Sequence, residues 1–289
     1  MASGWVLVKT ASEISLKSDF VRQQFMHSLE QNIKAALSRK HIQHSGFYRK
    51  GGRIFFQSEQ AEKAVKLLKK IFGIHAVAVA EKFSPAELPA IVQETANYAK
   101  KVLKKGNSFA VRAKIIGRHH FVSKAVEERC GDAVLSAVKG LKVNLSKPEV
   151  KISLEVFENE FFIYGFQEKC FGGLPVGVSG KTAFIPGKKL SGNFKACWLL
   201  MKRGCEIVFV GNPSGLSKKL EPWNSFHQFQ TAKSIEEALR NDCVCLASSE
   251  SVLSEKEFKD FEKFDEKQNA LVLRPLLLLP KNYFKEAGV

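Results

Sequence analysis

The sequence contains no apolar run long enough to cross a lipid bilayer, which takes roughly 20 residues. The longest late run, residues 276–279, is closed by Pro280. The N-terminus lacks a basic segment followed by a long apolar one, which excludes an ordinary secretory signal. These two absences predict a soluble, cytoplasmic chain with no membrane among its partners.

Cysteine is sparse, and no two cysteines have the spacing of a structural zinc site. Six cysteines stand at positions 130, 170, 197, 205, 243 and 245, without any C-x-x-C pair. We therefore expect no metal site and mostly structural, reduced thiols. Cys243 and Cys245 flank Val244 in a strand-like run, so both side chains should point to one face as a buried pair.

Acidic residues are too few to balance the basic ones. The 289 residues include 45 Lys and Arg against 29 Asp and Glu, a net charge of +16. Residues 1–180 contain 28 of the basic and 16 of the acidic residues, so anion binding should belong mainly to this part. By charge alone, nucleic acid and an acidic membrane surface are both candidate partners, and of the two we expect nucleic acid.

The densest basic block has no acidic residue at all. A solvated helix face explains most lysine runs, but such a face usually mixes charges of both signs. Here Phe109 and Phe121 lie among the cations, which favours a phosphate-binding ridge that passes from a helix end through a strand into a turn. The basic residues of this block are Lys100, Lys101, Lys104, Lys105, Arg112, Lys114, Arg118 and Lys124.

Hydrophobic periodicity predicts two α+β modules in the first part of the chain. The first has the order β-α-β-β-α-β of a ferredoxin-like domain, with Ser18 capping its first helix and Gly51-Gly52 in a hairpin turn. The second opens with a helix whose cap is expected at Ser84, before Pro85, and which runs to about Lys105. The remaining expected elements are a strand 5–9, a helix 18–37, strands 46–57, a helix 59–72, a strand 74–80, a strand 108–115, a helix 122–135 and a hairpin 150–166.

Glycines at 172, 173, 177 and 180 mark the start of a third unit. There the order becomes a strand to Ile185, a helix from about Lys195 to Arg203 and a strand 206–210, as at the start of a parallel sheet. Such sheets bind ligands at the loop after the first strand, which is Pro186–Asn193 here.

Three segments make the sequence resemble a known family, the tRNA 4-thiouridine synthases (tRNA sulfurtransferases). They are Phe109–Ser123, Asn144–Val150 and Gly172–Lys181. The resemblance implies a multidomain protein of α/β and α+β classes: an N-terminal ferredoxin-like domain at 1–80, a THUMP RNA-binding domain at 81–172 and a truncated parallel-sheet PP-loop pyrophosphatase-like domain at 173–289.

The resemblance also implies that the first two domains hold the acceptor stem of tRNA. Cations of the basic block would meet phosphates, while Ser123 and a helix N-terminus near Phe121 would supply hydrogen-bond donors. These contacts would read shape and backbone, because duplex RNA has a deep major groove that excludes side chains, so binding should be salt-sensitive. The predicted RNA-binding residues are Lys104, Lys105, Arg112, Lys114, Arg118, His119, Ser123 and Lys124. Glu13 and Lys17 lie in a segment similar to the family's opening motif, with a role that can be wholly structural.

The third unit resembles the family in Trp198–Gly204, Ser249–Ser251 and Leu273–Leu276 but departs from it at the loop. The family's PP-loop reads Ser-Gly-Gly-x-Asp-Ser, whose amides cradle the pyrophosphate of ATP. Aligned on Lys202-Arg203-Gly204, that motif falls on Lys188–Asn193, where no acidic residue stands, and a shifted register places Lys195 at the Asp position. The candidates for weak nucleotide binding in this degenerate loop are Lys188, Lys189, Ser191, Gly192 and Asn193.

Further departures indicate that the catalytic machinery is missing. Gly211-Asn212 replaces the family's His-Phe, and Ser249 replaces a glycine in its Gly-Glu-Ser. The link that leads to Cys243 is about half the family's length, no rhodanese domain follows within the sequence, and no cysteine takes a catalytic position. We therefore predict no catalytic residue and no cofactor.

Three functions remain open from the sequence. The first is a tRNA-binding protein that acts in tRNA modification as a noncatalytic adaptor, with a tRNA-modifying enzyme subunit as partner and a homodimer as a further candidate. The second is an active tRNA sulfurtransferase that uses ATP and magnesium to make 4-thiouridine. The third, a general RNA chaperone, depends on charge alone.

Overall fold

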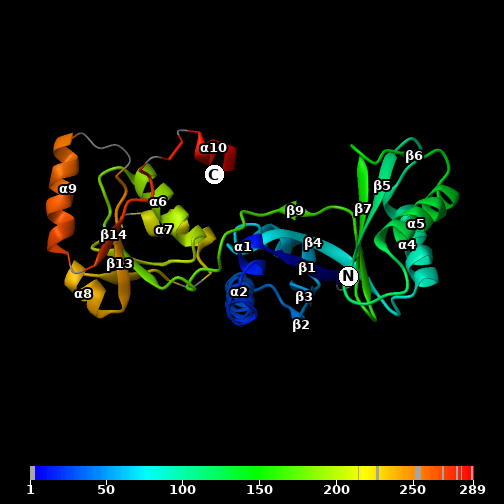
Figure 1. Ribbon diagram of the computed structural model, residues 1–289, viewed down its shortest axis with the longest axis horizontal. Helices are drawn as coiled ribbons and strands as arrows, with labels where there is room; N and C mark the ends of the chain where they lie inside the picture. The colour runs from blue at the N-terminus through cyan, green and yellow to red at the C-terminus, as the bar shows by residue number, and fades with distance from the viewer. Residues whose placement is uncertain are drawn as a thin grey trace. The chain divides into compact units, whose positions relative to one another are not determined.

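The computed structural model describes residues 4–213, 215–225, 228–250, 255–268, 270–277, 279–280, 282–287 and 289 (Figure 1). The chain divides into two compact units. The first unit consists of Met1–Val8, Gln43–Val65 and Val77–Glu168, and the second of Lys9–Ile42, Lys66–Ala76 and Lys169–Val289. Among the described residues, every helix is too short or too polar to cross a membrane.

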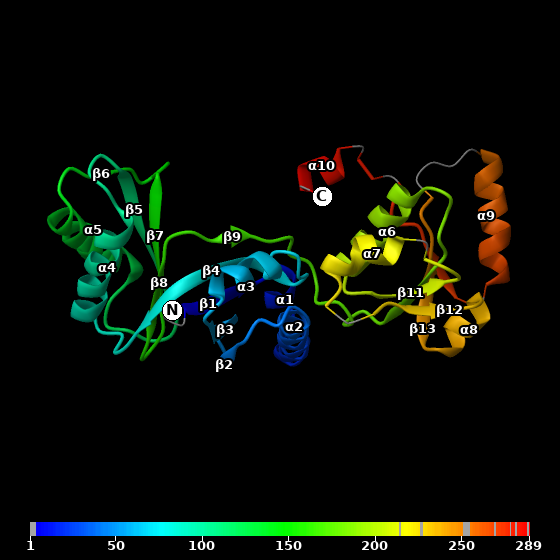
Figure 2. The ribbon, with the colours of Figure 1, turned by 180° about the vertical axis from the view of Figure 1, so that it is seen from behind.

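The first unit is built on a nine-stranded sheet of the described residues, with the order β2-β3-β1-β4-β8-β7-β5-β6 and with β9 paired to β4 (Figure 2). The strands are β1 Gly4–Thr10, β2 Ser45–Lys50, β3 Arg53–Ser58, β4 Ile74–Phe83, β5 Ser108–Ile115, β6 Lys142–Val143, β7 Val150–Val156, β8 Phe161–Tyr164 and β9 Glu168–Lys169. Strand β4 lies between β1 and β8, and Glu81 to Phe83 pair antiparallel with β8. The ferredoxin-like and THUMP parts therefore share one continuous sheet.

The expected hairpin at Gly51-Gly52 is confirmed. The two glycines have φ values of +55° and +71°, the left-handed conformation that a two-residue type I′ turn requires at both positions. A Cβ at Gly51 would also lie 2.8 Å from the ring of Phe157, so a side chain is excluded there on steric grounds as well.

Helices cover the THUMP part of the sheet. They are α4 Leu88–Val102 and α5 Ser123–Ala137, and their buried residues Ile91 and Val126 share a core with Phe109, Ile152 and Phe161 of the strands. A second core combines residues from both parts of the sheet, namely Leu7, Phe55, Ala78, Ala80, Phe157, Phe162 and Tyr164. Short helix α3 is Ala61–Leu68.

The second unit contains a parallel sheet with the strand order β12-β11-β10-β13-β14. The strands are β10 Lys181–Phe184, β11 Glu206–Val210, β12 Gln230–Ala232, β13 Cys243–Ala247 and β14 Leu271–Leu273. The helices of this unit are α1 Ser12–Ser15, α2 Asp19–Arg39, α6 Leu190–Lys202, α7 Leu216–Leu220, the 3₁₀ turn Glu221–Trp223, α8 Ile235–Arg240, α9 Glu255–Lys267 and α10 Tyr283–Ala287. Phe184 and Phe209 enter one core with Trp198, while Ala183 and Val208 enter another, as expected for a sheet buried on both faces.

Two helix starts and one helix cap differ from the sequence-based expectation. Helix α4 begins after Glu87 with Pro89 in its first turn, not after Ser84, and Ser84 and Pro85 lie in the loop before it. Ser18 does precede α2, but its side chain makes no capping hydrogen bond. Helix α6 begins at Leu190, not near Lys195, since Ser191-Gly192 continues the helix although this dipeptide is more typical of a loop.

Candidate nucleic-acid interface and ligand loop

The predicted RNA-binding residues lie at two ends of strand β5. Lys104 and Lys105 belong to the loop before β5, whereas Lys114 stands near its end, with Arg118 in the loop beyond it. An eight-residue strand that rises ~3.3 Å per residue separates these ends by about 23 Å. The expected ridge is therefore divided into two separate groups of cations.

The second group lies at the end of β5 and in the segment that leads into α5. Lys114, Arg118 and Lys124 are exposed, and Ser123 is the first residue of the helix. The first turn of α5 contains no acidic residue, and its N-cap, Val122, offers no side-chain hydrogen bond. The amides at this end are thus left without a side-chain cap, and both the cations and the helix dipole favour an anion there.

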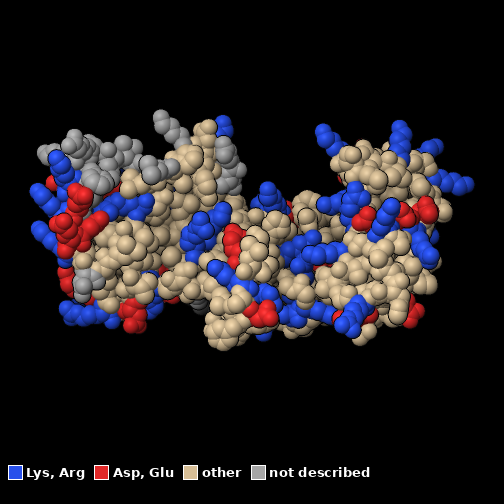
Figure 3. Space-filling model, viewed as in Figure 1, with Lys and Arg blue, Asp and Glu red and all other residues tan. Residues whose placement is uncertain are grey.

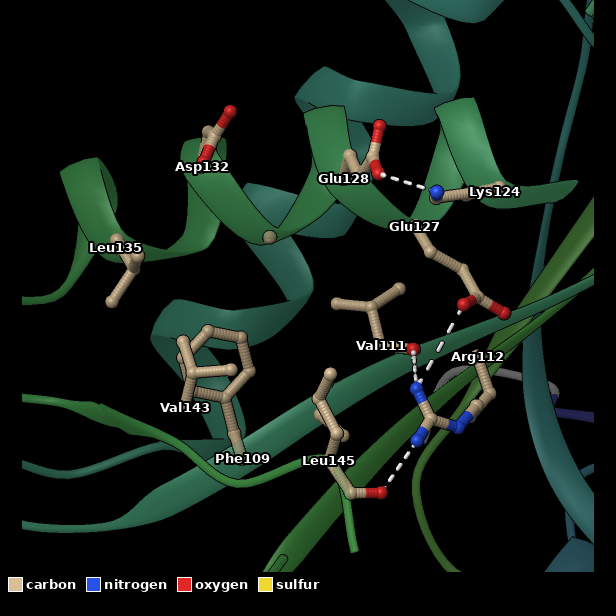
Figure 4. A pocket seen from close by; sticks show the side chains of 12 residues that line it. Phe109, Val111, Arg112, Lys124, Glu127, Glu128, Asp132, Leu135, Val143 and Leu145 are labelled. Atoms are coloured by element: carbon tan, nitrogen blue, oxygen red, sulfur yellow. Dashed lines mark hydrogen bonds and ion pairs between the residues drawn. The ribbon is translucent and has the colours of Figure 1, made fainter.

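Arg112 is held against the domain surface by three interactions. Its guanidinium donates to the carbonyls of Leu145 at 2.6 Å and Val111 at 3.1 Å, and lies 3.8 Å from the carboxylate of Glu127 (Figure 4). Glu127 in turn accepts the backbone amide of Ala113 at 2.9 Å. Arg112 therefore links α5 to β5 and is less available to RNA than the other cations.

A cavity of about 290 Å³ opens between α5 and β5, beside Arg112. Its walls are partly apolar, with Leu135, Val143 and Leu145, while Glu128 and Asp132 line the side formed by α5 (Figure 4). Lys124 lies 3.9 Å from Glu128. The carboxylates of Glu128 and Asp132 disfavour a phosphate inside the cavity.

The two phenylalanines among the cations are core residues, which corrects the expectation of a mixed cationic and aromatic surface. Phe109 is only 1% exposed because its strand position faces the helices, and Phe121 packs against the same core. His119 lies against Phe121, with ring centroids 5.0 Å apart, and its Nε2 is enclosed without a hydrogen-bond partner in the described part of the chain. The buried ring of Phe109 cannot stack on a base, and the ring of Phe121 is only partly exposed.

In the second unit, Asn193 closes the loop where the sequence predicts a ligand. Its Oδ1 accepts the backbone amide of Gly187 and its Nδ2 donates to the Gly187 carbonyl, both at 2.8 Å. The hydroxyl of Ser249, just beyond β13, donates to the same Oδ1 at 2.7 Å. Asn193 is 5% exposed and so connects the loops that follow β10 and β13.

Strands β10 and β13 are neighbours in the sheet. After β10 the next strand, β11, lies on one side of this pair, and after β13 the next strand, β14, lies on the other side. A topological switch point of this kind is where open α/β sheets bind ligands, and here hydrogen bonds within the protein connect the two loops across it. Lys188, Lys189 and Ser191 are exposed around this closed loop, and Gly192 lies against Ser249. Ser251, part of the family-like Ser249–Ser251 segment, lies outside the described residues.

The next polar groups along this edge are paired with one another. Arg274, after β14, donates to both carboxylate oxygens of Asp265 at 2.7 and 2.8 Å and lies 3.9 Å from Glu250. Ser248 donates to Glu250. Because these carboxylates neutralise the guanidinium, Arg274 offers little positive charge for a triphosphate.

Burial disfavours the thiolate form of four of the six cysteines. All six are free and buried. Burial raises the pKa of the Cys130 thiol to about 11 and raises the pKa values of Cys197, Cys205 and Cys243 as well. At neutral pH these thiols stay protonated and weakly nucleophilic. Within the described ranges, no group of three His, Cys, Asp or Glu side chains is arranged to hold a metal.

The prediction that Cys243 and Cys245 are buried on the same face of a strand is confirmed. Both are buried in β13, and the intervening Val244 is 64% exposed. The Thr182 hydroxyl lies 3.3 Å from the sulfur of Cys245.

Two protein-family models match the N-terminal part of the chain. The ThiI ferredoxin-like domain matches residues 5–78, and the THUMP domain matches residues 85–165. The second match contains β5, α5 and the cations around the N-terminus of α5.

Curated relatives are named probable tRNA sulfurtransferases. One from Methanosarcina mazei is 34% identical over 243 residues, covering 78% of this chain and 59% of that protein. One from Saccharolobus islandicus is 33% identical over 215 residues, covering 71% of this chain and 53% of that protein. The chain thus matches between half and three fifths of the length of these relatives.

Two solved structures share the fold. The crystal structure of PH1313 from Pyrococcus horikoshii superposes with a TM-score of 0.84 at 24% identity, covering 98% of this chain and 97% of that one. A 4-thiouridine synthetase–RNA complex with bound ATP superposes with a TM-score of 0.76 at 19% identity, covering 99% and 84%.

Proposed function

This chain belongs, by its ThiI ferredoxin-like and THUMP domains, with the tRNA sulfurtransferases, and we propose that it binds tRNA and acts in tRNA modification in the cytoplasm. The observation that carries the proposal is the group of exposed cations, Lys114, Arg118 and Lys124, between the end of β5 and the uncapped N-terminus of α5. Cations and free amides at a helix start bind phosphate oxygens without reading bases. The acceptor stem is the part of tRNA that we propose to lie there.

We propose further that the chain is a noncatalytic adaptor that presents tRNA to a partner enzyme. The support is Asn193, which takes up the amide and carbonyl of Gly187 and the hydroxyl of Ser249 at the switch point. ATP does not fit this loop, because the Gly187 amide is already bonded and no acidic residue occupies Lys188–Asn193 to help hold magnesium. The raised pKa values of the buried thiols also argue against sulfur transfer through them.

An active sulfurtransferase is the second candidate, because relatives at 34% and 33% identity bear that name. This activity needs specific, magnesium-dependent binding of ATP and a reactive thiol. It also needs Asn193 to release the Gly187 amide, which the adaptor does not.

Calorimetric titration of the purified chain with magnesium and ATP, with and without tRNA, separates the two candidates. The adaptor binds tRNA with an affinity that falls as salt rises, and produces no ATP-dependent heat. Specific ATP binding, or 4-thiouridine formed in tRNA with ATP and a sulfur donor present, contradicts the adaptor. Equal affinity for tRNA and for unrelated duplex RNA of the same size contradicts both candidates and indicates a general RNA chaperone.

A further inference from the structure

Two loops meet at the start of β5, at the end of the THUMP domain opposite the N-terminus of α5. The Gly106 amide donates to the Gly140 carbonyl, and the Lys142 amide to the Asn107 carbonyl, both at 3.0 Å. The Asn107 side chain also accepts the Lys104 amide at 2.9 Å. These bonds fix the loop that follows α4 against the loop that follows α5.

Four exposed lysines project from these two loops, which we call the lysine end: Lys104, Lys105, Lys139 and Lys142. Figure 3 shows Lys and Arg side chains extending into solvent where the loops around β6 lie. The segments that supply them contain no acidic residue, since Asp and Glu are absent from residues 95–126 and 133–148. None of the four forms an ion pair with a carboxylate of the described residues.

The carboxylate of Glu149, near Lys142, is engaged elsewhere. It accepts the backbone amide of Ser108 at 2.6 Å and the Ser108 hydroxyl at 3.2 Å. These bonds, with a smaller contribution from Lys142, lower the pKa of Glu149, which therefore stays ionised. One carboxylate in this position leaves most of the positive charge of the lysine end without a counterion in the protein.

Stabilisation of helix ends does not account for this charge. Cations stabilise the C-terminus of a helix mainly when they lie in its last turn. In α4, Lys100 and Lys101 already occupy that turn. Lys139 and Lys142 lie beyond Ala137, the last residue of α5. Four neighbouring like charges repel one another, and a polyanion removes that repulsion.

We propose that the lysine end is a second phosphate-contact surface for duplex RNA, about 23 Å along β5 from the cations at the N-terminus of α5. This inference rests on the proposed function, because it assigns a further part of the same RNA. The two surfaces belong to one domain and are held by one strand, so a single RNA stem reaches both when it is long enough. The lysine end contacts the part of the stem farther from the N-terminus of α5.

The test compares two double variants of the full chain. Lys139→Gln with Lys142→Gln removes half of the lysine end, while Lys218→Gln with Lys219→Gln removes the same charge from exposed positions of α7. Binding of tRNA is measured at several salt concentrations. The first variant should lower the slope of log affinity against log salt by about 1.4–1.8, the release expected from two phosphate contacts, and the matched control should leave it unchanged.

A stem-loop too short to reach from one end of β5 to the other sharpens the comparison. The wild-type chain and the Lys139, Lys142 variant should bind it equally. Equal salt slopes of the two double variants on tRNA overturn the inference. An equal loss of affinity of the Lys139, Lys142 variant for the short and the long stem also overturns it. If the lysine pair instead governs binding to vesicles containing phosphatidylglycerol and leaves tRNA binding unchanged, the surface is for membranes and the inference is also overturned. Failure of the wild-type chain to bind tRNA at all contradicts the proposed function itself.

Discussion

At the scale of single residues, exposure and pairing decide which cations are available to RNA. Arg112 is engaged by Glu127 and Leu145, whereas Lys114 is exposed at the end of β5. The sequence identifies both as basic but cannot show that one is already paired, because Glu127 and Leu145 are brought to Arg112 only by the tertiary structure.

Replacement of Lys114 by Gln should weaken tRNA binding to a similar extent for different tRNAs, because a phosphate contact carries no base preference. The salt slope should fall by about 0.7–0.9, the value for one released counterion. Filter binding across a salt series measures both effects. Lys233→Gln, an exposed change of the same charge in the second unit, is the control, and identical slopes for the two variants would show that Lys114 does not face RNA.

Cys130 should make the first unit less stable at alkaline pH. Burial raises the thiol pKa from 9.0 to about 11, against a smaller opposing effect of Thr95. An acid whose pKa is higher in the folded state favours folding fully below its unfolded pKa, and that contribution is lost as pH rises toward the folded pKa. About two pKa units correspond to roughly 2–3 kcal/mol lost between pH 9 and 11.

Urea unfolding of the wild type and of Cys130→Ala at pH 7 and pH 10 measures this linkage. The variant loses packing at both pH values, but its stability should decline less between them. A decline of the same size in both proteins would assign the alkaline loss to other groups.

At the scale of elements, the strands and helices could largely be predicted from the sequence, and the local contacts at their ends could not. Strand β5 was expected at 108–115 and the structure has those bounds, because its alternating pattern is set by the residues themselves. The start of α6 was expected five residues too late. Ser191 and Gly192 favour a loop by their own propensity, and the hydrogen bonds of Asn193 with Gly187 and Ser249 are tertiary contacts that no local pattern reveals.

Asn193→Ala should destabilise the second unit by about 1–3 kcal/mol, because it removes the side chain that satisfies the Gly187 amide and carbonyl and the Ser249 hydroxyl. Chemical denaturation followed by tryptophan fluorescence reports on this unit through Trp198 and Trp223 of its core. Ser191→Ala, at an exposed helical position nearby, should change stability by less than about 0.5 kcal/mol. Equal stability of the wild type and Asn193→Ala would show that the loop does not depend on this side chain.

At the scale of the whole molecule, the first unit is organised by one sheet that passes through both domains matched by the family models. The expected boundary after residue 80 falls within β4, whose residues Glu81 to Phe83 pair with β8. The ring of Phe162 in β8 stacks on Phe55 of β3 at 4.4 Å and meets Trp5 of β1 edge-on at 6.1 Å. Sequence periodicity gives each module separately and contains no signal for the pairing of one module with the other.

Phe162→Ala should therefore destabilise both parts of the first unit together, by roughly 3–5 kcal/mol. Hydrogen exchange followed by mass spectrometry should show faster exchange in β3 and in β7, which lie on opposite sides of β4 in the sheet order. Leu135→Ala, at a position 40% exposed in α5, is the control and should leave β3 unaffected. Faster exchange confined to β7 would show that the two parts unfold independently.

Asn193 also limits how the sequence of this loop can evolve. Its side chain is part of the folded loop, so any single replacement there removes hydrogen bonds before a phosphate-binding loop has been assembled. The alignment requires changes at Lys188, Lys189, Leu190, Gly192 and Asn193 to reach Ser-Gly-Gly-x-Asp-Ser. We expect intermediate sequences to lose stability without gaining a ligand, and mutation with selection then favours the present loop over a gradual return to a nucleotide-binding one.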